Sequence, residues 1–293
     1  PSWYATKSSD ITDSSEMRRL TLCILCAVAA LMAWAQDTSP LRPVLASYTL
    51  SVGSARVTDT YLTPLTYTGW HTGLGYTRMQ ASRWAPERWT AMLDTRLWVE
   101  KVENPPRTAA MWSAGIRAQW GMVRRWALPC GLTLAAGPAL GIDAGAVYNA
   151  RNGNNPVGAR AAITADLTGF ASYAVHIRRL PVTFIYRPSL PVIGTFFSPE
   201  YGELYYEIYL GNRRGLMHPA WWGSRFGLDN TLTADINFGT TSLRIGYEGR
   251  ILSTKTNHIV TRNISHCLTV GVSGLWLPMS GRKTHARAIN PCR

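Results

Sequence analysis

Cysteine is scarce in this sequence, with 5 residues in 293, and neither cysteine nor histidine recurs at a metal-ligand spacing. The three cysteines beyond residue 40 are Cys130, Cys267 and Cys292, and so odd and irregular a set does not form a disulfide framework. Ser265 and His266 are adjacent, so on a strand they would point to opposite faces and could not act as a local nucleophile and base. We therefore predict no catalytic residue, no metal site and no cofactor, and a protein that is not an enzyme.

Long hydrophobic runs are missing too, apart from residues 20–32. This run is shorter than the roughly 20 residues that a membrane-spanning helix needs. A Met-Arg-Arg triplet precedes it and Ala-Trp-Ala follows it, which is the order of a signal peptide and its cleavage site. We predict an upstream polar segment at 1–16 that is not native, a signal peptide at 17–35 and a mature chain from Gln36; a membrane anchor is the alternative.

Acidic side chains are few, 17 against 30 lysines and arginines, which leaves a net charge of +13. Removal of the signal peptide keeps this excess, because the basic and acidic residues of the first 35 positions cancel. A basic exported protein suits partners such as the lipid bilayer, lipopolysaccharide or a small anionic solute. Nucleic acid is excluded as a partner by the secretion signal.

The sequence is rich in apolar and polar side chains that alternate with a period of two, the pattern of half-buried strands. Residues 228–247 show it best: Leu232 and Ile236 fall on one face, Asp229 and Asp235 on the other, and a tight turn separates two such arms. We count ten such segments between residues 36 and 280. Short turns alternate with longer loops between them, which is typical of a barrel with one short-turn rim and one long-loop rim.

The fold class predicted is all-β: a single antiparallel transmembrane β-barrel of about ten strands, with twelve as the alternative. It occupies residues 36–280 and is followed by a basic tail, 281–293. Its expected location is the outer membrane of a Gram-negative bacterium. A soluble periplasmic β-sandwich that binds a ligand is the competing fold, because sandwich strands alternate in the same way.

Tryptophan is abundant, with 12 residues, and several stand at the ends of predicted strands. Trp112 and Trp120 bracket one apolar face and are eight positions apart, about 26 Å along a strand. With strands tilted as in outer-membrane barrels, that separation approaches the height of the apolar band. We predict a membrane girdle that includes Trp112, Trp120 and Trp276.

Charged residues recur on the faces opposite the apolar ones, so a barrel would turn them toward its lumen. Unpaired charges there would be costly, and we expect them to form ion pairs that seal the lumen or, alternatively, line a solute-selective channel. These predicted lumen charges are Asp94, Arg96, Glu100, Arg117, Arg160, Asp166, Asp229, Asp235, Arg244 and Glu248.

Residues 191–226 form the longest segment without clear alternation, although one more strand is possible at 204–210. Loops of this length in a compact domain are usually functional. Its aromatics would make an exposed patch in water, so we expect the segment to fold over the lumen and cap it. Aromatics beside carboxylates suit a glycan or cationic ligand, and this predicted loop cluster is Glu200, Tyr201, Tyr205, Tyr206, Trp221 and Trp222.

Three short pieces resemble a family of outer-membrane β-barrels of Bacteroidota: the signal end Ala35-Gln36, the segment DTYLTPLTYTG at 59–69 and the segment PEYGELYYEI at 199–208. The resemblance covers roughly residues 40–277. It implies a barrel in the outer membrane, and because the family has no established activity it implies no catalytic residues. We expect a non-enzymatic barrel that is a small pore, a surface binder or a structural barrel; the alternative is a lipid hydrolase built on the barrel wall.

Overall fold

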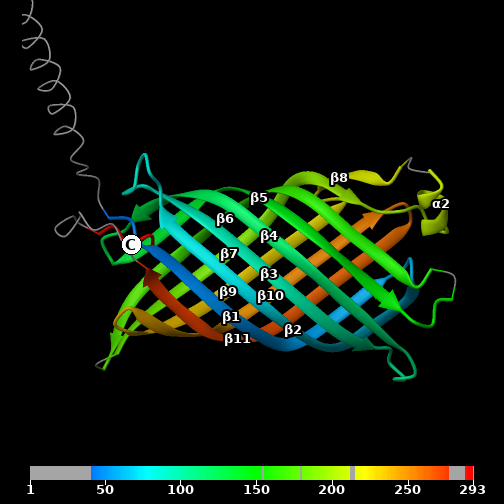
Figure 1. The fold of residues 1–293 in the computed structure, drawn as a ribbon, viewed down its shortest axis with the longest axis horizontal. Helices are drawn as coiled ribbons and strands as arrows, with labels where there is room; N and C mark the ends of the chain where they lie inside the picture. Colours follow the sequence, from blue (N-terminus) through cyan, green and yellow to red (C-terminus); the bar gives the residue numbers. More distant parts are fainter. Residues whose placement is uncertain (1–40, 154, 179, 212–214, 277–287, 293) are drawn as a thin grey trace, which may run out of the picture. The chain divides into compact units, whose positions relative to one another are not determined.

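The chain forms a closed antiparallel barrel in the computed structural model, which describes residues 41–153, 155–178, 180–211, 215–276 and 288–292 (Figure 1). The upstream segment, the signal peptide and residues 281–287 of the basic tail lie outside these ranges. The strands are β1 (Val44–Asp59), β2 (Thr63–Ala81), β3 (Trp89–Glu103), β4 (Ala110–Ala127), β5 (Leu132–Asn149), β6 (Val157–Ile177), β7 (Leu180–Phe197), β8 (Met217–Trp221), β9 (Arg225–Phe238), β10 (Thr241–Thr256) and β11 (Ile259–Trp276).

Ten of these strands close the barrel. Each pairs with its neighbour in the chain, β7 pairs with β9, and β1 pairs with β11 along its whole length, from Val44 opposite Trp276 to Asp59 opposite Thr261. The pairing of β6 with β7 completes the ring. The predicted ten-stranded barrel is confirmed, and the competing sandwich is wrong because a closed ring of strands has no second sheet to pack on.

The segment 191–226 is more regular than its sequence suggests. Strand β7 continues to Phe197, and β8 pairs with the end of β7, Met217 opposite Phe197 and Trp221 opposite Ile193. The expected strand at 204–210 is wrong: this stretch contains the short helix α2 (Tyr205–Tyr209), whose Leu204 backbone N–H donates to the Glu207 carboxylate. Residues 204–210 are apolar or aromatic except for Glu207, so the stretch lacks the period-two alternation of a half-buried strand.

The two ends of the barrel differ. One, which we call the terminal rim, carries the start of β1, the end of β11 and the connections after β2, β4, β6 and β9. The other, the loop rim, carries the remaining connections, of which the one from β7 to β9 is the longest and includes helix α2 (Figure 1). The predicted alternation of short turns and long loops is wrong in part. At the loop rim the connections after β1 (60–62) and β10 (257–258) are tight turns, because the paired strands continue almost to the end of the barrel, whereas the connection after β2 at the terminal rim covers residues 82–88.

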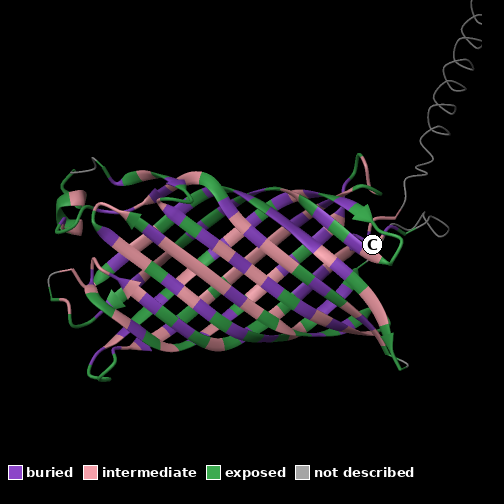
Figure 2. Ribbon diagram, turned by 180° about the vertical axis from the view of Figure 1, so that it is seen from behind, coloured by how far each residue is buried: buried purple, intermediate pink, exposed green. Residues whose placement is uncertain are grey.

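Burial alternates along every long strand, which shows as alternating colours in Figure 2. The exposed set is apolar: on β11, Leu268 is 73%, Val270 53% and Val272 52% exposed, whereas the intervening Thr269 is 2% exposed. Polar side chains therefore point inward and apolar ones outward, the reverse of a soluble barrel. No helix of the described residues is long and apolar enough to cross a membrane.

Candidate functional site: a filled lumen

The lumen contains several clusters of paired charged side chains, which together we call the lumen network. Its members come from every strand of the ring except β11. They are Asp59, Asp94, Arg96, Glu100, Arg117, Asp143, Arg160, Asp166, Arg187, Arg225, Asp229, Asp235, Arg244, Glu248 and Arg250, with His71 paired to Glu100.

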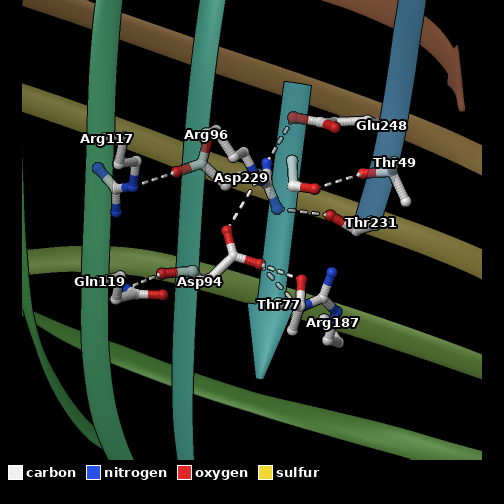
Figure 3. A network of polar contacts seen from close by, with 12 residues as sticks. Thr49, Thr77, Asp94, Arg96, Arg117, Gln119, Arg187, Asp229, Thr231 and Glu248 are labelled. Atoms are coloured by element: carbon white, nitrogen blue, oxygen red, sulfur yellow. Dashed lines mark hydrogen bonds and ion pairs between the residues drawn. The ribbon is translucent and has the colours of Figure 1, made fainter. Parts of the chain in front are cut away.

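Arg96 on β3 joins its own strand to β9 and β10 on the opposite side of the barrel (Figure 3). Its Nε donates to Asp94 of the same strand at 2.9 Å and its Nη1 to Glu248 of β10 at 2.7 Å. Its Nη2 donates to the Thr231 hydroxyl at 2.8 Å, and β9, which carries Thr231, stands opposite β3 in the ring. Arg187 of β7 completes the cluster with a 2.8 Å bond to Asp94. The Arg96 side chain therefore reaches across the lumen to the opposite wall.

Asp143 on β5 is the second centre of the network. It accepts hydrogen bonds from Arg117 at 2.8 Å, from Arg225 at 3.0 Å and from Arg250 at 2.6 Å. Arg117 in turn contacts Asp166 at 2.8 Å and Asp229 at 3.2 Å. Asp143 is thus surrounded by three guanidinium groups, and Arg117 by three carboxylates. Every charge of this cluster lies within bonding distance of an opposite charge.

All ten lumen charges predicted from the sequence lie inside the barrel, and each has an oppositely charged or histidine partner. Arg160 reaches Asp59 across the lumen at 3.1 Å, since β6 and β1 stand on opposite sides of the ring. Sequence reasoning missed some partners. These partners are Asp59, His71, Asp143, Arg187, Arg225 and Arg250. Strand parity would have found them: Arg225 and Arg250 follow the inward register of predicted charges on β9 and β10, and the other four alternate with outward apolar residues on strands that carry no predicted charge.

Every basic residue of the network other than His71 is arginine. The planar guanidinium offers five N–H donors in a fixed fork and so can bridge two or three carboxylates at once, which an ammonium on a flexible stem does less well. Arg244 shows this: its Nε and Nη2 bind both oxygens of Asp235 at 2.7 Å each, while its Nη1 reaches Ser47 at 2.6 Å. The choice of arginine makes the network a set of fixed cross-links.

An apolar layer closes the lumen toward the loop rim. Val57, Val102, Met111 and Val147 have no exposed surface there, and Leu62, at the turn between β1 and β2, packs into the same cluster. Asn152 of the β5–β6 loop donates to the Leu62 carbonyl at 3.2 Å. This turn therefore reaches across the barrel mouth to the opposite wall and caps it.

Two tyrosines fix that cap. The Tyr61 hydroxyl donates to the Glu203 carbonyl at 2.6 Å, and the Tyr205 hydroxyl accepts from the Ala159 backbone N–H at 2.7 Å. The two rings meet edge to face at 5.9 Å. Burial raises the pKa of both phenols, and for Tyr61 the nearby Tyr205 and Glu203 raise it further. Both hydroxyls therefore keep their protons.

A second apolar layer closes the lumen toward the terminal rim, with Met79, Met92, Val123, Phe170 and Ile185. Residues 288–292 enter this end of the barrel. The Ile289 N–H donates to the Leu41 carbonyl at 2.8 Å, the Thr90 hydroxyl to the Pro291 carbonyl at 3.0 Å, and Arg125 to the Asn290 carbonyl at 2.6 Å.

Little free space remains between these layers. The cavities beside the lumen network measure about 20 to 40 Å³ each, room for roughly one to three water molecules. A wider space of about 250 Å³ lies at the terminal rim, beside Asn237, Gly239 and Asn290. Within the described residues the lumen is filled and not an open channel.

The predicted loop cluster does not assemble as expected. Tyr201, Tyr206, Trp221 and Trp222 are 56–68% exposed, Tyr205 is half-buried and Glu200 is exposed. The expectation that their aromatic surface must turn inward is wrong, because the β1–β2 turn already fills the mouth. The predicted girdle residues Trp112, Trp120 and Trp276 are 44%, 56% and 64% exposed on the outer wall.

Ser265 and His266 point to opposite faces, as their spacing predicts: Ser265 is buried and His266 is exposed. The structure places a different serine near His266. Ser54 on β1 is its direct cross-strand partner on the outer wall, and the Tyr247 hydroxyl bonds the His266 Nδ1 at 2.6 Å. Among the described residues Ser54 and His266 share no hydrogen bond. No cluster of three metal-ligating side chains occurs in the same part of the chain.

The closed ring, apolar outer wall and filled lumen define a β-barrel of the outer-membrane type. The chain belongs to a family of proteins of unknown function (DUF3316), which matches residues 20–283. No curated protein matches it.

Solved barrels of the outer membrane resemble it weakly. The outer membrane protease OmpT from Escherichia coli is 8% identical, with a TM-score of 0.43 over 80% of this chain and 97% of that one. The translocator domain of the autotransporter NalP from Neisseria meningitidis is 14% identical, with a TM-score of 0.36 over 90% of this chain and 97% of that one. The β domain of the Bordetella autotransporter BrkA is 12% identical, with a TM-score of 0.37 over 80% and 99%.

Proposed function

We propose that this protein is a sealed, non-enzymatic barrel of the outer membrane of a Gram-negative bacterium, exported by a cleavable signal peptide. It anchors the loop rim at the cell surface and does not conduct solutes. The observation that carries this proposal is a lumen filled by cross-linked charges between two apolar layers, inside a wall whose outer face is apolar. The origin in Bacteroidota remains a prediction from the sequence.

The apolar outer wall supports the membrane location. Side chains such as Leu50, Leu74, Ile116, Leu140 and Val270 are 40–59% exposed, which a soluble protein would hide. A hydrocarbon environment removes that penalty, and a closed barrel leaves no backbone group unpaired in lipid.

The filled lumen supports a role other than a pore. An open channel would leave charges facing water, whereas here arginines and carboxylates bond directly across the barrel. The exposed aromatics of the loop rim, Tyr201, Tyr206, Tyr209, Trp221 and Trp222, provide the surface on which a glycan or another ligand would bind. The barrel-wall hydrolase remains an alternative, and Ser54 with His266 is the pair it would use.

Conductance in a planar bilayer tests the proposal. We expect the refolded protein, inserted at many copies per membrane, to give no steady current steps. Heat-modifiable migration on gels and recovery of protein from the bilayer serve as controls. They show that an absence of current comes from a closed lumen and not from failed insertion. Reproducible current steps from an intact barrel would show that the lumen is open.

A further inference from the structure

Three cations on the outer wall near the loop rim have no partner within the described residues. Lys255 on β10, Arg262 on β11 and Arg56 on β1 are all exposed, and their side chains make no ion pair or hydrogen bond there. By contrast, the arginines of the lumen network are all paired. Unpaired cations gathered in one place are available for an external anion.

The strand register brings these three side chains together. Arg262 is opposite Ser253 on β10, two residues from Lys255, and opposite Thr58 on β1, two residues from Arg56. Diagonal neighbours of this kind stand about 7–8 Å apart, within reach of long side chains. The outward positions of these three strands include no aspartate or glutamate to compete for the cations.

The outer wall between these cations and the terminal rim indicates which kind of anion would bind. Toward the terminal rim the same wall first exposes two polar side chains, His266 and Ser54. Beyond them it exposes the apolar side chains Val52, Leu268 and Val270. A free inorganic anion would use only the cations. A molecule with phosphate groups at one end and acyl chains at the other would match the cationic, the polar and the apolar part of this wall. Its phosphates would bind the cations and its acyl chains would pack on the apolar side chains.

We propose that Lys255, Arg262 and Arg56 form a docking site for the phosphate groups of a phosphorylated glycolipid in the outer leaflet, whose acyl chains lie along β10, β11 and β1. This inference rests on the proposed membrane location, with the loop rim on the outer side. The side chains act as point charges and hydrogen-bond donors, Arg262 at the centre and the other two beside it. His266 and the Tyr247 hydroxyl bonded to it face the sugar end of the lipid.

Binding of fluorescent bis-phosphorylated lipid A to the purified barrel in detergent tests the site. Each cation near a lipid surface contributes about fivefold, so we expect the variant R56Q/K255Q/R262Q to bind roughly a hundredfold more weakly and R262Q alone about fivefold. The control R78Q/R83Q/R124Q removes the same charge from exposed positions near the terminal rim and should bind like the wild type.

Two further arms identify the ligand chemistry. Dephosphorylated lipid A should bind the wild type as weakly as the phosphorylated form binds the triple variant, and free pyrophosphate should compete poorly. Equal binding of both lipids, or equal loss in the control variant, would overturn the site. Heat-modifiable migration and insertion into vesicles, measured for every variant, show separately whether the barrel itself assembles; failure of the wild type to insert would count against the proposed function and not against the cation site.

Discussion

At the scale of single residues, the lumen network is a system of charges that depend on one another. A buried ion pair is weak evidence for stability in itself, because desolvation offsets the attraction between the charges. Removal of one partner is another matter, since it leaves its neighbours buried and unpaired. Arg117, with three carboxylates around it, is the residue whose loss should have the largest effect of this kind.

The substitution Arg117→Ala tests this dependence. A residue that merely faced a water-filled lumen would tolerate it, but Asp143, Asp166 and Asp229 would lose a shared partner. We expect a loss of about 3–5 kcal/mol in the free energy of unfolding, measured by urea titration of the barrel in vesicles. Arg83→Ala, at an exposed turn, should change it by less than about 0.5 kcal/mol. Similar small changes in both variants would mean that water fills the lumen after all.

At the scale of elements, two short segments close the barrel mouths. The β1–β2 turn inserts Leu62 at the loop rim, and residues 288–292 enter the terminal rim, where Cys292 is 4% exposed and its Sγ lies 3.8 Å from the Met79 Sδ. Neither segment is a long loop, and neither has a periodic sequence. The β1–β2 turn and residues 288–292 therefore close the two mouths of the barrel. The longest connection, between β7 and β9, stays largely outside.

Thiol labelling tests the position of the terminal segment. Burial raises the pKa of the Cys292 thiol to about 12, so almost no thiolate forms at pH 8. We expect the mature variant C130S/C267S, in which Cys292 is the one thiol left, to react with a maleimide at least a hundredfold more slowly when folded than in urea.

The matched variant C267S/C292S retains Cys130, which is exposed at the β4–β5 turn, and should react quickly in the folded barrel. If Cys292 in the folded protein reacts as fast as Cys130, residues 288–292 do not enter the lumen.

At the scale of the whole molecule, the barrel is turned inside out relative to a soluble protein. Its polar side chains are in the core and its apolar ones cover the wall, which is the arrangement of side chains that a barrel surrounded by lipid requires. The net charge of +13 is consistent with this, since the lumen charges are close to balanced and the excess of basic residues lies outside them.

The variant Ile116→Arg tests the orientation of the wall. Ile116 is 40% exposed at mid-strand on β4, and a cation there should cost about 2–4 kcal/mol in the bilayer. We expect a lower yield of heat-modifiable, membrane-inserted protein, whereas Ile116→Leu should insert normally. Unimpaired insertion of the arginine variant would reverse the assignment of inner and outer faces.

The sequence determined the fold class and the faces of the strands. A period of two is a local property, so each alternating segment reveals which side chains share a face without any knowledge of its neighbours. That is why the ten strands and the inward position of Asp94, Arg117 or Arg244 could be predicted. Parity would also have placed Asp143 and Arg250 inside, had the pattern been followed along the full length of β5 and β10.

Only the tertiary structure decided which charges meet, what closes the lumen and where outer-wall residues gather. Arg96 meets Thr231 and Arg160 meets Asp59 because the ring brings strands far apart in sequence to opposite walls, a distance that no local pattern encodes. The same holds outside: Ser54 faces His266, and Arg56 lies beside Arg262, because β1 pairs with β11. Closure of the barrel joins its first and last strands, β1 and β11, and the register of that pairing exists only in the folded molecule.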